Sequence, residues 1–223
     1  LGRVTYTPSE IEHQNLRQRV LEEGRFVKCK GETGVYAKVD AEDGELIDGL
    51  KTKRVDELLG RFARSKEPFF LAAGLRRPHL PLILPKKYFD LYPPEQISLP
   101  PQPPNYDAAT WLPREEQRKV IAHYYAATTF MDARVGEILA SLERHGLARN
   151  TLVVLFGDQG YALGERENHY GKGTLTENSY AVPLIVAGPG IRQAGKMCRK
   201  IVELIDLYPT LAQLAGLAAP DGL

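Results

Sequence analysis

The stretch Thr151-Leu-Val-Val-Leu-Phe156 is an apolar run that ends in the polar turn Gly157-Asp-Gln-Gly160. A short apolar run bounded by turn residues is typical of a strand that is buried on both faces of a sheet. Asp158 and Gln159 therefore follow the predicted strand at its carboxyl end. Ligands in open α/β sheets bind at that end of the strands, so this turn is a candidate functional site. The alternative is an Asx-type turn that only closes the strand.

Predicted helices and strands alternate on both sides of this stretch. Apolar residues recur every three or four positions from 113 to 146, which predicts a long amphipathic helix, and a second helix fits 52–64. The runs 68–74 and 182–187 read as two more buried strands, and a capped helix is predicted from Ser9 to Glu23. This order predicts an α/β fold with a largely parallel central sheet flanked by helices.

The bulk composition excludes several classes of protein. The 223 residues are 43% hydrophobic, and 29 Lys and Arg nearly balance 28 Asp and Glu, so no basic excess indicates a nucleic-acid partner. No apolar run approaches the roughly 20 residues that a membrane-spanning helix needs. Cys29 and Cys198 lack the spacing of a zinc site, and whether they form a disulfide stays open.

Several polar residues in the predicted loops could carry chemistry. Asp158 and Gln159 offer two adjacent oxygen ligands, which suit a hard cation such as calcium. His79 lies between two prolines that stiffen its backbone, so it could bind an anion or act as a general acid, or simply pack in its loop. Lys172, between two glycines, could bind an anionic substrate or be an ordinary solvated lysine. His169 lies near the candidate site and is ambiguous, and the pair at 76–77 could face an acidic ligand or solvent.

An ordered set of motifs between about Val55 and Gly216 resembles the sulfatase family of the alkaline phosphatase superfamily, in particular its iduronate-2-sulfatase-like bacterial members. The motifs are Pro68-Phe-Phe-Leu-Ala-Ala-Gly74, Pro78-His-Leu-Pro81, Lys86-Lys-Tyr-Phe-Asp-Leu-Tyr92, Tyr124 to Gly136, Asp158-Gln-Gly-Tyr-Ala-Leu-Gly-Glu165, Gly171-Lys-Gly173, Val182-Pro-Leu-Ile185 and Asp206-Leu-Tyr-Pro-Thr-Leu211.

The resemblance implies a calcium-assisted hydrolysis of sulfate esters by a formylglycine nucleophile, with an alkaline-phosphatase-like core. By this likeness Asp158 and Gln159 are calcium ligands, Lys172 binds the sulfate group, and His79 contacts the sulfate and protonates the leaving alcohol. The implied substrate is a sulfated small molecule or glycan, and the implied location is extracytoplasmic: periplasmic, secreted or lysosomal.

The sequence also departs from the family pattern. Neither Cys29 nor Cys198 fits the C/S-x-P/A-x-R motif that yields formylglycine, and there is no Asp-Asp pair to complete the calcium shell. Gln159 stands where relatives often carry His or Asn, and the segment from Asp158 to Lys172 is about one residue longer than in close relatives. We therefore expect residues 1–223 to be a partial sulfatase catalytic domain that lacks the N-terminal, nucleophile-bearing segment and is inactive alone.

Two alternatives follow from the same residues. A phosphatase or phosphodiesterase of the same superfamily would use two transition metals and several imidazoles, and Gln159 in place of a histidine argues against it. A non-catalytic remnant or binding domain would keep the fold without the chemistry, which the missing nucleophile motif favours.

Overall fold

A computed structural model describes residues 16–25, 35–101, 112–165 and 169–218. The chain forms two compact units, which are described separately. The first comprises residues 1–148 and 157–183, and the second comprises 149–156 and 184–223. Residues 9–15 of the helix predicted from Ser9 to Glu23 lie outside the described residues. Within the described residues, no helix combines the length and the apolar character needed to cross a membrane.

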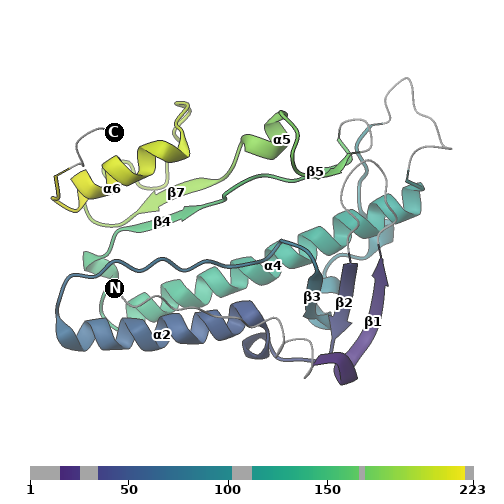
Figure 1. The fold of residues 1–223 in the computed structure, drawn as a ribbon, viewed down its shortest axis with the longest axis horizontal. Coiled ribbons are helices and arrows are strands. Elements are labelled where there is room, and N and C mark those ends of the chain that lie inside the picture. The colour runs from purple at the N-terminus through teal and green to yellow at the C-terminus, as the bar shows by residue number, and fades with distance from the viewer. Residues whose placement is uncertain (1–15, 26–34, 102–111, 166–168, 219–223) are drawn as a thin grey trace. The chain divides into compact units, whose positions relative to one another are not determined.

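The first unit contains a three-stranded sheet in the order β1-β2-β3 (Figure 1). After the short helix η1 (Arg17–Arg19), β1 (Val20–Arg25) pairs antiparallel with β2 (Val35–Val39), and β2 pairs in parallel with β3 (Leu82–Pro85). The prediction that a helix continues to Glu23 was therefore wrong. Local capping signals stabilise a helix only slightly. Here they are outweighed by backbone hydrogen bonds to a neighbouring strand, whose residues are distant in sequence.

Two long helices of the first unit, both predicted from the sequence, run side by side (Figure 1). The helix α2 (Ile47–Ser65) begins five residues before the expected start, and α4 (Arg114–Arg144) matches its prediction closely. Asp56 of α2 accepts hydrogen bonds from Ser141 Oγ at 2.5 Å and from an Arg144 guanidinium nitrogen at 2.8 Å, so a carboxylate ties the two helices together.

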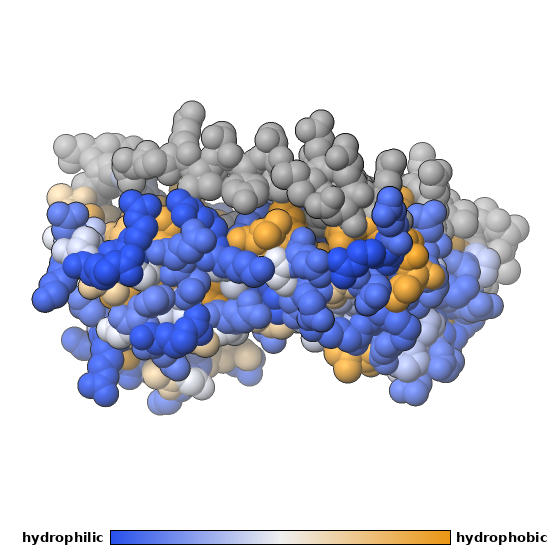
Figure 2. All heavy atoms as spheres, turned by 90° about the horizontal axis from the view of Figure 1, so that it is seen from below, coloured by the Kyte–Doolittle hydropathy of each residue, from blue (hydrophilic) through white to orange (hydrophobic). Residues whose placement is uncertain are grey.

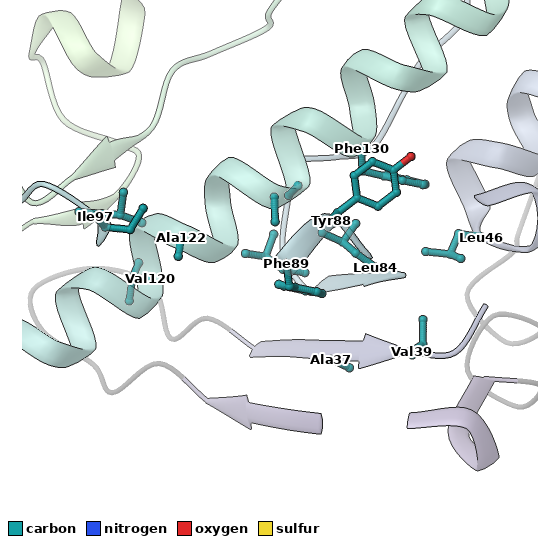
Figure 3. Close-up of a cluster of buried hydrophobic side chains, with 14 of the residues drawn as sticks. Ala37, Val39, Leu46, Leu84, Tyr88, Phe89, Ile97, Val120, Ala122 and Phe130 are labelled. Carbon is teal, nitrogen blue, oxygen red and sulfur yellow. The ribbon is translucent and has the colours of Figure 1, made fainter. Parts of the chain in front are cut away.

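The core of the first unit lies between α4 and the sheet. Figure 3 shows Phe130 of α4 above Tyr88, Phe89 and Leu84, and the Phe130 ring meets the Tyr88 ring edge-on at 5.2 Å. Phe130 is fully buried.

Shorter elements complete this unit: η2 (Asp43–Glu45), α3 (Lys86–Phe89), η3 (Pro94–Gln96), η4 (Ala148–Asn150, at the junction with the second unit), β5 (Ala162–Leu163), β6 (Tyr170–Gly171) and α5 (Glu177–Tyr180). On the face in Figure 2, hydrophilic side chains surround separate apolar patches.

The second unit is built on the pair β4 (Val153–Phe156) and β7 (Leu184–Ala187), followed by η5 (Leu204–Asp206) and α6 (Leu207–Leu214). The predicted strands around Val154 and Ile185 thus share a sheet, but their pairing is antiparallel. The side chains are less buried than a strand covered on both faces requires, with Phe156 49% and Ile185 56% exposed.

A largely parallel central sheet is not seen in the described residues. Of the four strand pairings there, only that of β2 with β3 is parallel. The predicted strand 68–74 forms no strand, and Phe70 is 76% exposed. An apolar run becomes a strand only where a neighbour accepts its backbone hydrogen bonds, and none of the described strands pairs with this segment.

Candidate functional site

His79 lies in the loop that connects α2 to β3, and hydrogen bonds within this loop fix its ring. Its backbone N–H donates to the Arg76 carbonyl at 2.9 Å, and its Nδ1 lies 2.7 Å from the Leu80 carbonyl oxygen. A carbonyl oxygen can only accept, so we assign the ring proton to Nδ1 from this contact. Nε2 is then the acceptor nitrogen of the ring.

Lys172 reaches that acceptor nitrogen. Its Nζ lies 3.4 Å from His79 Nε2, so the ammonium can donate a weak hydrogen bond to the neutral ring. Lys172 follows β6, which pairs antiparallel with β5. Two candidate residues 93 positions apart in sequence therefore meet, as predicted. Lys172 Nζ can donate to an anion, and His79 Nε2 can do so only when the ring carries a second proton.

Asp158 and Gln159 occupy a turn that is held at both ends by backbone hydrogen bonds. The Gly157 N–H donates to the Pro183 carbonyl at 3.1 Å, and the Gly160 N–H donates to the Ser179 carbonyl at 2.8 Å. Both side chains are exposed, and neither has a hydrogen-bond or ion-pair partner among the residues that the structure describes. Their oxygens are therefore available to a cation.

Gly160 is required by the close approach of two backbones. A Cβ at this position would lie 2.0 Å from the Asn178 carbonyl oxygen, which no side chain can do. Thr174 reinforces the same segment, because its hydroxyl lies 2.6 Å from Ser179 Oγ. The turn that carries Asp158 and the segment that follows Lys172 are thus both bonded to Ser179.

The register of β5 and β6 relates Lys172 to the turn. Ala162 pairs with Gly171, which places Lys172 opposite Tyr161, three residues after Asp158. The convergence of Asp158 and Gln159 with the His79–Lys172 pair stays a prediction. In the described ranges no three His, Cys, Asp or Glu residues lie close enough together to hold a metal ion.

The remaining candidates have structural contacts. Arg77 is 3% exposed, and its guanidinium donates to the Ile83 carbonyl at 3.0 Å, so it holds β3 to the loop instead of facing solvent. The His169 carbonyl accepts from the Gly164 N–H at 3.0 Å and closes the β5–β6 hairpin. His123 lies outside this group of candidates and packs in the core at 4% exposure, where burial lowers its pKa to about 4.

Sequence reasoning missed Asp48, a fully buried carboxylate in the first turn of α2. Its oxygens accept hydrogen bonds from the backbone N–H groups of Arg76, at 2.7 Å, and Arg77, at 3.0 Å. Because the helix was predicted to begin at Thr52, Asp48 fell in an unassigned segment. No local signal reveals a bond between residues 28 positions apart.

Comparison with known proteins gives a consistent result. The sulfatase family model matches residues 8–217. A sulfatase of Formosa agariphila is 38% identical over 217 residues, covering 87% of this chain, and human iduronate 2-sulfatase is 29% identical over 273 residues, covering 96%. The chain spans 42% and 48% of these relatives, which is less than half of each.

A solved structure shares the fold. Phosphonate monoester hydrolase SpPMH from Silicibacter pomeroyi superposes with a TM-score of 0.73 over 82% of this chain and 40% of its own, at 24% identity. At that identity the likeness concerns the fold alone.

Proposed function

The chain belongs to the sulfatase family, and from this membership we propose that it is part of an enzyme that hydrolyses sulfate esters, with sulfated carbohydrates as the substrate class. The observation that carries the proposal is the 3.4 Å contact between Lys172 Nζ and His79 Nε2. The substrate class is supported by a relative whose name specifies a sulfated uronic acid.

The paired nitrogens suit the charge of a sulfate group. Sulfate ester cleavage builds negative charge on the sulfate oxygens and on the leaving oxygen, and preorganised donors stabilise such charge. Lys172 supplies an ammonium group that can contact a non-bridging oxygen and the leaving oxygen. An incoming sulfate would take over the Lys172 contact that His79 Nε2 has in the structure.

His79 can act as general acid only from one of its nitrogens. Nδ1–H is committed to the Leu80 carbonyl, so the transferable proton must be carried on Nε2. The ring therefore needs a second proton when substrate is bound, and that proton would pass from Nε2 to the departing alcohol oxygen. The Leu80 contact holds the ring in place throughout.

Asp158 and Gln159 fit a calcium site in part. Calcium takes about six to eight oxygen ligands, and this turn offers one carboxylate and one amide oxygen without competing partners in the described structure. Bound calcium would polarise the sulfate oxygens. We propose that the remaining ligands and a formylglycine nucleophile come from an N-terminal segment outside residues 1–223, and that the complete protein acts outside the cytoplasm.

The test uses the complete natural gene product, assayed on an activated aryl sulfate, a sulfated sugar and an aryl phosphate. We expect turnover of both sulfate esters and little of the phosphate. His79→Ala should lower the rate on the sulfated sugar by about 10²–10⁴-fold and on the aryl sulfate by much less, because a good leaving group needs no proton. Preference for the phosphate would favour the phosphatase alternative, and no turnover of any ester would favour the non-catalytic one.

A further inference from the structure

Asp48 is a buried carboxylate with an unusual set of partners. Its side chain is 0% exposed, and carboxylates are almost never fully buried unless they are paired. Oδ1 accepts from the Arg76 N–H at 2.7 Å and Oδ2 from the Arg77 N–H at 3.0 Å, while Lys51 Nζ lies 3.6 Å from Oδ1. Each oxygen therefore bonds to a different, consecutive residue of the His79 loop.

Lys51 attaches the His79 loop to α2 at one more residue. Its ammonium donates to the Gly74 carbonyl at 2.8 Å. One turn of α2 thus holds the loop at Gly74, Arg76 and Arg77, just before His79. Because both anchoring side chains belong to a long helix, the start of the loop is fixed relative to a rigid element.

The attachment continues from the loop backbone to the imidazole. The Arg76 carbonyl accepts from the His79 N–H at 2.9 Å, and the Arg76 guanidinium lies 3.4 Å from the Leu80 carbonyl oxygen. That same oxygen accepts the Nδ1 proton of His79 at 2.7 Å. An unbroken series of contacts therefore leads from Asp48 through Arg76 to the nitrogen that sets the His79 tautomer.

We propose that Asp48 is a positioning residue for His79: it holds the loop so that Nδ1–H stays on the Leu80 carbonyl and Nε2 stays aimed at Lys172 and the leaving group. This inference rests on the proposed sulfatase function. An Asp48→Asn amide has nearly the same shape, but its NH₂ would face one of two backbone N–H donors. That donor would lose its partner in a buried place, which the loop can relieve only by moving.

The experiment compares Asp48→Asn with Asp56→Asn in the complete protein. Asp56 is a matched control, because it lies on the same helix and accepts hydrogen bonds from α4 instead of from the His79 loop. We expect Asp48→Asn to lower kcat on the sulfated sugar on the order of 10²-fold, the scale of a misplacement of about 1 Å, and on the activated aryl sulfate by much less. Asp56→Asn should lower thermal stability without changing the ratio of the two rates. Equal losses on both substrates with Asp48→Asn would overturn the proposal.

A second variant and a second measurement keep the proposal testable if Asp48→Asn fails to fold. Lys51→Met removes the bond to Gly74 at a partly exposed position and should cause a smaller shift of the rate ratio in the same direction. Nitrogen-15 NMR of the His79 ring needs no turnover. It should show the Nδ1–H tautomer in the wild type and a mixture in folded Asp48→Asn. An unchanged tautomer and rate ratio in both variants would refute the positioning role, whereas a wild type without sulfatase activity would refute the proposed function instead.

Discussion

Buried His123 should make the stability of this protein depend on pH. The ring packs 3.9 Å from the Tyr36 ring and 5.0 Å from the Phe89 ring, and its Nδ1 bonds to the Lys119 carbonyl. Burial lowers its pKa from the ordinary 6.5 to about 4. Below pH 6.5 the unfolded chain therefore takes up a proton that the folded chain does not, and the free energy of unfolding falls as the pH falls. The stabilising contribution is complete above pH 6.5 and is lost toward pH 4.

The size of the effect follows from the interval between the two pKa values. About 2.5 pH units at 1.36 kcal/mol each give a maximum of about 3 kcal/mol, and about 2.5 kcal/mol of it should be lost by pH 4.5. Such a loss is a large fraction of the stability of an ordinary domain.

The assay is urea unfolding at pH 7.5 and pH 4.5, for the wild type and for His123→Phe, which keeps a ring in the same place. Carboxylates titrate in both proteins and cancel in the comparison. The wild type should lose about 2.5 kcal/mol more than the variant between the two pH values. The same pH dependence in both proteins would show that His123 is protonated in the folded state as easily as in the unfolded state, and the reasoning from burial would fail.

Three further outcomes are expected. Lys172→Ala should lower kcat/KM of the complete enzyme, with a loss of transition-state stabilisation of roughly 2.7–4 kcal/mol, as removal of an oxyanion donor does. An unchanged kcat/KM would exclude contact between Lys172 and the sulfate. Calorimetric titration of residues 1–223 should find calcium binding weaker than about 10 µM, because the turn at Asp158 offers two ligands, whereas submicromolar binding would contradict an incomplete shell. Phe130→Ala should lower the free energy of unfolding by about 3–5 kcal/mol, and a loss below about 1 kcal/mol would mean that the core collapses around the gap.

The features predicted well from sequence are those that local periodicity determines. The long helix α4 carries an apolar stripe from Val120 to Leu142, and the strands around Val154 and Ile185 are short apolar runs between turn residues. The meeting of His79 with Lys172 was also predicted, but from a strand at 68–74 that the structure does not contain, so the expected contact is present without the expected strand.

The features that were missed depend on partners distant in sequence. Strand direction is one of them, since the apolar run at Ile185 looks the same in a parallel and in an antiparallel pair. The run at Phe70 has the composition of a buried strand but no neighbour among the described strands. The sequence around Asp48 does not reveal that its carboxylate accepts a hydrogen bond from the distant Arg76 backbone.

The short β5–β6 hairpin has an evolutionary consequence. Its pairing of Ala162 with Gly171, closed by the bond from Gly164 to His169, sets the place of Lys172 whatever the number of residues between Gly164 and His169. We expect insertions and deletions between those two residues to leave the lysine in place. The same stretch is a natural place to graft an epitope or a spectroscopic reporter.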